Sequence, residues 1–110
     1  MPSIEADLLE ERSGEAAALL KLMANRHRLL ILCYLHEETL SVSSLQSKLS
    51  LSQSALSQHL ANLRQAGVVS TARKGTEVHY RLADHRVVEL LATLQEVICQ
   101  PEEFIEHKTK

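Results

Sequence analysis

The chain has 110 residues, 45% hydrophobic and 24% charged, with a formal net charge of −2. This length and composition predict one globular domain, and they exclude a disordered chain or a sequence-blind nucleic-acid binder that is basic throughout. With 3% aromatic residues and no tryptophan, the chain is also poorly suited to stacking on single-stranded bases.

Charge and hydropathy are unevenly spread along the chain. Residues 1–15 carry five carboxylates against one arginine, whereas residues 54–86 carry five cations against two carboxylates. A local basic patch can attract phosphate even when the whole chain is weakly acidic.

The longest apolar run, 29–35, is too short to cross a bilayer, and no secretory signal is visible. We therefore expect a cytoplasmic protein without a membrane contact, with its two cysteines reduced unless a signal oxidises them.

The first half of the chain predicts four helices. Residues 4–24 are helical by propensity, with Gly14 as a possible break. Residues 25–36 form an apolar helix capped by Asn25, which we expect to be buried almost all round. A short helix follows, capped by Ser41 or Ser43, and then a fourth, capped by Ser50 or Ser52 and ended by Gly67 in a left-handed conformation.

After Gly67 the pattern predicts a hairpin and a last helix. Residues 68–73 and 76–82 alternate on either side of a Lys74-Gly75 turn, which is typical of two antiparallel strands. Asp84 then caps a helix over 85–100 whose apolar residues cover more than one stripe. The first helix has the same excess, so we expect a homodimer built from the two terminal helices.

The fourth helix, in "LSQSALSQHLANLRQAGVV" (51–69), has two different faces. Leu56, Leu60 and Leu63 form an apolar stripe for the core. The other face is small, uncharged and rich in hydrogen-bonding groups, which suits entry into a major groove; a solvated face without a partner is the alternative. A helix, a capped turn, this helix and a basic-tipped hairpin are in the order of a winged helix-turn-helix. The predicted fold is therefore mainly α with a small β-hairpin, dimerising through the N- and C-terminal helices.

The strings "LKLMANRHRLLILCYL", "LSQSALSQHLANLRQAGVV" and "VHYRL" resemble those of the ArsR family of small dimeric bacterial repressors. The resemblance implies double-stranded operator DNA as a partner and a division into an acidic helical extension (1–15), a winged helix-turn-helix and dimerisation domain (16–100) and a polar tail (101–110). It also implies the residues that contact DNA. On the recognition helix these are Gln53, Ser54, Ser57 and Gln58, and on the hairpin tip they are Arg73 and Lys74. His59 lies nearer the apolar stripe, and we expect it to pack or bond locally.

Most members of that family release DNA on binding a metal, but the matching positions here carry other residues. Ser41 and Ser43 stand where one site requires thiolates, and neutral hydroxyls do not replace these for soft ions. At a second site Asp84 is present, but Arg86, Val97 and Gln100 occupy the other ligand positions. No histidine pair rebuilds either site, so we expect no metal and no cofactor, with Asp84 acting as a helix cap.

Cys33 and Cys99 remain as candidate sensor residues. From composition alone, a lone cysteine in an apolar helix, such as Cys33, usually packs as a small core residue, whereas Cys99, near the end of the last helix, is expected to be the more accessible of the two. The two positions resemble the cysteines of one ArsR branch, the persulfide-sensing repressors of the BigR and SqrR type, and of the related HlyU-type activators. This resemblance implies that reactive sulfur species bridge Cys33 and Cys99 and thereby release the operator.

Two alternative functions stay open. One is a HlyU-type activator that displaces a silencing protein and is generally redox-sensitive. The other, from a different class, is a winged-helix module that binds protein instead of DNA. An enzyme is not expected, because the sequence contains no nucleophile–base pair, glycine-rich phosphate loop or metal constellation.

Overall fold

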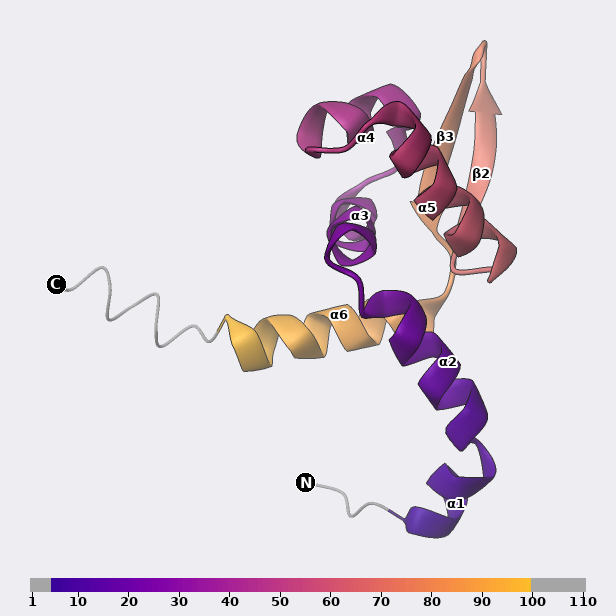
Figure 1. Ribbon diagram of the computed structural model, residues 1–110, viewed down its shortest axis with the longest axis vertical. Coiled ribbons are helices and arrows are strands. Elements are labelled where there is room, and N and C mark those ends of the chain that lie inside the picture. The colour runs from indigo at the N-terminus through magenta and orange to yellow at the C-terminus, as the bar shows by residue number, and fades with distance from the viewer. Residues whose placement is uncertain (1–4, 100–110) are drawn as a thin grey trace, which may run out of the picture.

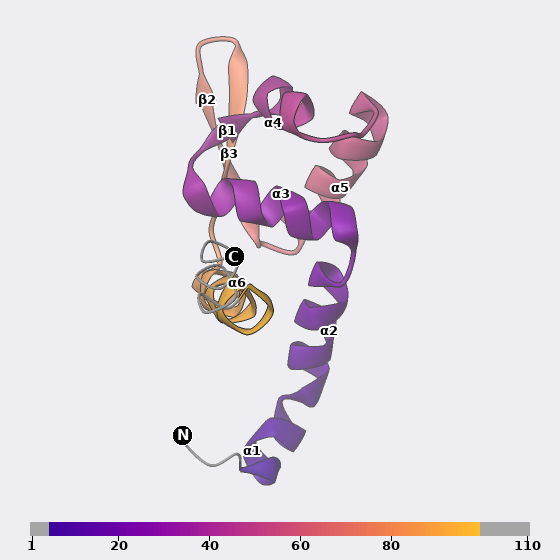
Figure 2. The same ribbon diagram turned by 90° about the vertical axis from the view of Figure 1, so that its left-hand side faces the viewer.

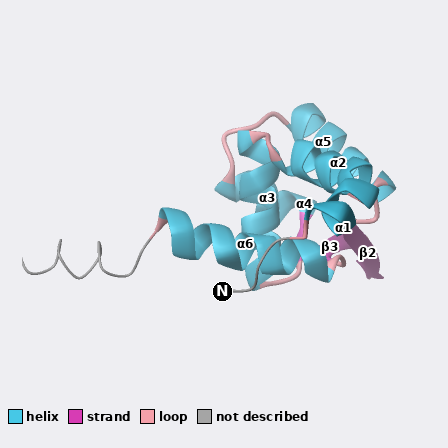
Figure 3. Cartoon of the chain, turned by 90° about the horizontal axis from the view of Figure 1, so that it is seen from below, coloured by secondary structure: helices cyan, strands magenta, loops and turns pink. Residues whose placement is uncertain are grey.

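The computed structural model describes residues 5–99 and is mainly helical, with a small sheet at one corner (Figures 1 and 3). Its elements in chain order are α1 (Ala6–Glu11), α2 (Ser13–Met23), α3 (Arg26–Glu37), β1 (Leu40–Ser41), α4 (Val42–Lys48), α5 (Gln53–Gln65), β2 (Val69–Lys74), β3 (Glu77–Leu82) and α6 (His85–Ile98). No helix within residues 5–99 is long and apolar enough to span a membrane.

Helix α3 crosses the middle of the molecule, with α4 and the hairpin on one side and α6 on the other (Figures 1 and 2). Its Ile31, Leu32 and Leu35 are buried and pack with apolar side chains from α4, α5, the sheet and α6. Removing one such side chain from water contributes about 1.5–3 kcal/mol. The expectation that α3 is buried almost all round is wrong, because Leu30 and Cys33 are exposed.

Short polar side chains begin four of the helices. The Asn25 side chain accepts hydrogen bonds from the backbone N–H groups of His27 and Arg28, at 3.0 and 3.1 Å. Ser41 caps α4, Ser52 caps α5 and Asp84 caps α6, each accepting a backbone N–H. Each cap satisfies a donor that the helix itself leaves unpaired. Of the predicted alternatives, Ser41 and Ser52 are therefore the caps.

The sheet has three antiparallel strands in the order β1-β3-β2. The hairpin β2–β3 was predicted, and its turn contains Gly75 at φ 64°. Gly67, at φ 77°, ends α5 in the left-handed conformation expected from the sequence. Strand β1 was not predicted. Its Leu40 and Ser41 pair with Tyr80 and His79 of β3, which connects the start of α4 to the β2–β3 hairpin, the wing of the fold.

The N-terminal helix is interrupted at Arg12, and Gly14 lies inside α2. Arg12 adopts φ −113° and ψ 19°, and the Ser13 hydroxyl donates to the Glu10 carbonyl at 2.9 Å. A side-chain bond of this kind offers the backbone an alternative to the helical ladder, which explains why the break does not fall at the glycine.

The outer helices leave apolar side chains uncovered. In Figure 1, α1 and α2 lead away from the wing and α6 projects to the side. Leu9 and Leu20 are 54% and 56% exposed, and Ile98 is 67% exposed. An apolar surface of this kind on a protomer is typical of an interface.

Candidate DNA-reading surface and cysteine groove

Helix α5 separates a core stripe from a polar surface, as the sequence predicts. Leu56, Leu60 and Leu63 are at most 1% exposed. The four predicted groove-reading side chains are all exposed: Gln53, Ser54, Ser57 and Gln58. The Ser52 hydroxyl, which accepts the Ala55 N–H at 3.1 Å, starts the helix one residue before this surface. The polar groups therefore lie in the N-terminal half of α5, where they can meet base edges.

The wing tip carries the two predicted cations on exposed side chains. Arg73 and Lys74 end strand β2, opposite Val78 and Glu77 of β3. The hairpin extends beyond α5 at the end of the molecule opposite α1 (Figure 1). If α5 enters a groove of DNA, cations at such a tip lie where they can contact the DNA backbone.

Cys33 and Cys99 lie in one groove between α3 and α6, although 65 residues separate them in the chain. The groove has a volume of about 360 Å³ and is lined mainly by apolar side chains, among them Leu29, Leu91 and Ile98. Both cysteines are free and exposed. The two predicted sensor residues are thus brought together, without a bond between them.

This groove is also lined by His36, which lies near Cys33 in the sequence, and by Glu37, which the sequence did not single out. Partial burial of the thiol, the carboxylate of Glu37 and the neighbouring Cys99 together raise the pKa of Cys33. Cys33 is therefore mostly the neutral thiol at neutral pH. Glu37 lies one helical turn after Cys33, and the i, i+4 spacing is the sequence signal that could have identified it.

The positions of the family's metal sites serve structural roles here. Ser41 is 5% exposed, and its hydroxyl accepts the Ser44 N–H at 3.2 Å as the cap of α4. Asp84 caps α6 and binds Arg86, whose guanidinium holds the pKa of that carboxyl below its usual range. Within residues 5–99 no three metal-ligating side chains lie together. Gln100 lies outside the described residues.

His59 packs locally, as expected, and its neighbour is His27 of α3. The two ring centroids are 6.0 Å apart, and the His59 Nδ1 is buried without a hydrogen-bond partner. Burial lowers the pKa of His59, and the nearby Arg28 and His27 lower it further. The neutral imidazole is therefore part of the contact between α3 and α5.

Comparison with known proteins identifies the family. Residues 25–71 match the family model of bacterial regulatory proteins of the arsR family. The transcriptional activator HlyU of Vibrio cholerae is 48% identical over 92 residues, which cover 84% of this chain and 85% of that protein. The chain belongs to the ArsR family.

Other relatives of this ArsR-family protein are repressors. The biofilm growth-associated repressor of Agrobacterium fabrum is 41% identical over 95 residues, covering 86% of this chain and 81% of that protein. The crystal structure of the transcriptional repressor BigR from Xylella fastidiosa matches with a TM-score of 0.83 at 33% identity, over 87% of this chain and 98% of that one.

These findings confirm the coarse predictions made from the sequence. This ArsR-family protein is a DNA-binding transcriptional regulator with a winged helix-turn-helix fold, and it is not an enzyme. The match to this family of DNA-binding regulators also argues against the alternative function, a winged-helix module that binds only protein. The similar proteins include both an activator and repressors of transcription.

Proposed function

We propose that this regulator is a dimeric repressor that releases its operator when reactive sulfur species bridge Cys33 and Cys99. The observation that carries the proposal is their shared groove between α3 and α6, in which both thiols are accessible. A disulfide requires the two Cα atoms to lie within about 7 Å, and a longer sulfur chain relaxes that limit. The groove therefore offers a pair of thiols that one small oxidant can join.

The chemistry balances with a persulfide, RSSH, as the oxidant. One thiolate takes the outer sulfur of RSSH, which forms a cysteine persulfide and releases RSH. The second thiolate attacks the Sγ atom of the first cysteine, the bond between that Sγ and the transferred sulfur breaks, and the transferred sulfur leaves as sulfide. Two thiols have then lost two electrons, and the transferred sulfur has been reduced to sulfide.

An organic tetrasulfide, RSSSSR, forms a longer bridge. The first thiolate attacks an inner sulfur and releases RSSH after protonation. The second thiolate attacks that same sulfur and releases RSH, which leaves three sulfur atoms between the two cysteine β-carbons. The raised pKa of Cys33 limits its thiolate fraction at neutral pH, so these reactions speed up as the pH rises.

A bridge between α3 and α6 can act on DNA binding through the dimer. We infer that α1, α2 and α6 form the dimer contact, which is supported by the exposed Leu9, Leu20 and Ile98. Operator half-sites are about one helical turn apart, so a change in the spacing of the two α5 helices lowers affinity. A coupling of about 1–3 kcal/mol lowers it about 5–150-fold.

The dimer contact is tested by Ile98→Glu, with Ile98→Leu as the conservative control. A carboxylate buried at an apolar interface is costly, so Ile98→Glu should sediment as a monomer and Ile98→Leu as a dimer. Dimeric Ile98→Glu protein would place the interface elsewhere.

The sensor is tested by intact mass spectrometry after anaerobic incubation with glutathione persulfide, with glutathione disulfide and peroxide as controls. In the unsubstituted protein both thiols should become resistant to alkylation, and the mass should correspond to a Cys33–Cys99 bridge of two or more sulfurs. Cys33→Ser and Cys99→Ser should form no intramolecular bridge and should keep their DNA affinity in the persulfide. Protein that remains unmodified, or that releases DNA with either cysteine replaced, would contradict the proposal.

A HlyU-type activator is the second candidate, because of the 48% identity to that relative. A repressor and an activator are distinguished by a reporter gene placed downstream of the DNA that the protein binds. Deletion of the gene should raise reporter output for a repressor and lower it for an activator.

A further inference from the structure

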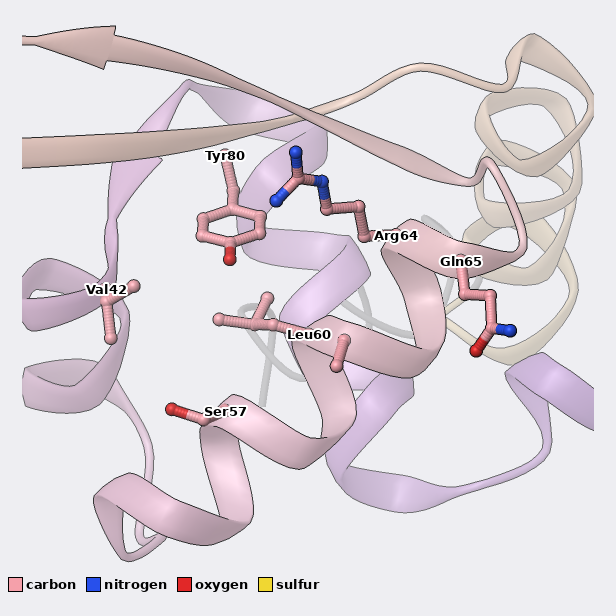
Figure 4. Close-up of a pocket in the computed structure, with 7 residues that line it drawn as sticks. Val42, Ser57, Leu60, Arg64, Gln65 and Tyr80 are labelled. Carbon is pink, nitrogen blue, oxygen red and sulfur yellow. The ribbon is translucent and has the colours of Figure 1, made fainter.

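A cleft of about 410 Å³ lies between α5 and the wing. The recognition helix contributes Ser57 and Arg64, β3 contributes Tyr80, and Val42 at the start of α4 closes one side. In Figure 4 the Tyr80 hydroxyl points toward α5, the Arg64 side chain extends toward Tyr80, and the Ser57 hydroxyl faces Val42. The cleft thus adjoins the reading surface at Ser57 and contains a cation and hydroxyl groups.

The charge of Arg64 has no partner within residues 5–99. By contrast, Arg12 and Arg86 pair with Glu15, and Arg81 donates to the Ser70 hydroxyl. None of the residues lining the cleft is acidic. A cation that the fold does not use, in a cleft without carboxylates, is complementary to an anion.

We propose that this cleft holds one sugar-phosphate unit of the bound DNA, with the phosphate on the Arg64 guanidinium and the Tyr80 hydroxyl and the deoxyribose against Val42. The inference rests on the proposed placement of α5 in the major groove with the wing on the DNA backbone. In that placement, the strand that borders the groove passes between α5 and the hairpin, where the cleft lies. Ser57 at the edge of the cleft then connects the phosphate contact with base reading.

Phosphate contacts and base contacts have different signatures in binding measurements. A phosphate contact strengthens binding to every sequence and adds about one unit to the slope of log affinity against log salt. A base contact acts only on the preferred sequence. Arg64 should therefore behave as a positioning residue for DNA of any sequence.

The experiment compares Arg64→Ala and Tyr80→Phe with the unsubstituted protein. The control is Arg12→Ala, on an exposed arginine between α1 and α2, the two helices that lead away from the wing (Figure 1). The probes are a duplex selected by the protein from a random pool and an unrelated duplex of equal length. Affinities are measured by fluorescence anisotropy between about 50 and about 200 mM salt.

Arg64→Ala should weaken binding to both duplexes by about tenfold, the usual effect of losing a charged hydrogen bond, and should lower the salt slope by about one unit. Tyr80→Phe keeps the packed ring and should weaken binding to both duplexes by about fivefold without a change in slope. Arg64→Lys should keep the slope, because the charge is retained. Arg12→Ala should match the unsubstituted protein.

Two results would overturn the phosphate site. One is an Arg64→Ala protein with unchanged affinities and slope, and the other is a loss confined to the selected duplex, which would make Arg64 a base-reading residue. The Ser57→Ala variant shows whether only the phosphate site is wrong or whether the placement of α5 in the major groove is wrong as well. If Ser57→Ala weakens selected binding and Arg64→Ala has no effect, only the phosphate site is wrong. If neither variant has an effect, the placement of α5 is wrong as well.

Discussion

Arg86 joins two helices that are far apart in the chain. Its guanidinium contacts the Glu15 carboxylate of α2 at 2.6 Å and the Asp84 carboxylate, the cap of α6, also at 2.6 Å. The pair with Glu15 spans 71 residues and crosses from the N-terminal to the C-terminal helix. Arg86 occupies a position that matches a metal ligand in other members of the family, and here its positive charge links α2 to α6.

The cap and the ion pair at Asp84 can be separated by two substitutions. Asp84→Ala removes both and should lower the free energy of unfolding by about 1 kcal/mol, the usual cost of losing an N-cap. Asp84→Asn keeps an oxygen for the Arg86 N–H and should retain most of that stability. Urea denaturation of the three proteins measures the difference. Equal losses in both variants would show that the ion pair, and not the cap, is the larger contribution.

Two glycines should respond in opposite ways to the same substitution. Gly14 lies inside α2 with open space around it, so Gly14→Ala should raise the free energy of unfolding by about 0.5–1 kcal/mol. Gly67 also has open space, but its φ of 77° is unfavourable for any residue with a Cβ. Gly67→Ala should therefore lower the free energy of unfolding by about 1–2 kcal/mol. Thermal unfolding of both variants checks the signs, and a stabilising Gly67→Ala would contradict this account of the α5 terminus.

The elements that were predicted correctly depend on short-range signals. Asn25, Ser52 and Asp84 cap helices because a small polar side chain reaches a backbone N–H two or three residues away. The core stripe of α5 and the hairpin follow from the periods of helix and strand. The residues that make up each of these signals lie close to one another in the sequence.

The missed features depend on contacts between distant segments. Strand β1 has only two residues and exists because Leu40 pairs with Tyr80. The exposure of Cys33 depends on how α6 passes α3, which apolar content alone does not specify. The cleft between Arg64 and Tyr80 likewise requires the wing to be placed beside α5.

Protonation of His59 should weaken the protein in mildly acidic solution. Its pKa is lower in the folded protein than in the unfolded chain, so the unfolded chain binds a proton more readily. The free energy of unfolding should therefore fall as the pH decreases from about 7.5 to about 5.5, across the ordinary histidine pKa. His59→Gln should reduce this pH dependence of the free energy of unfolding. Parallel urea titrations at both pH values measure it, and an unchanged dependence in His59→Gln would assign the effect to another group.

The reading face and the wing tip should differ in sequence dependence. Ser57→Ala or Gln53→Ala should weaken binding to the selected duplex by roughly 1–3 kcal/mol each and leave unrelated DNA almost unaffected, if these side chains contact bases. Lys74→Ala should weaken both duplexes alike and lower the salt slope by about one unit, because it removes one phosphate contact. The two sets of residues lie on different elements, α5 and β2, so their effects on binding free energy should add. Affinity for the selected duplex that is unchanged in both Ser57→Ala and Gln53→Ala would show that another face of α5 reads the DNA.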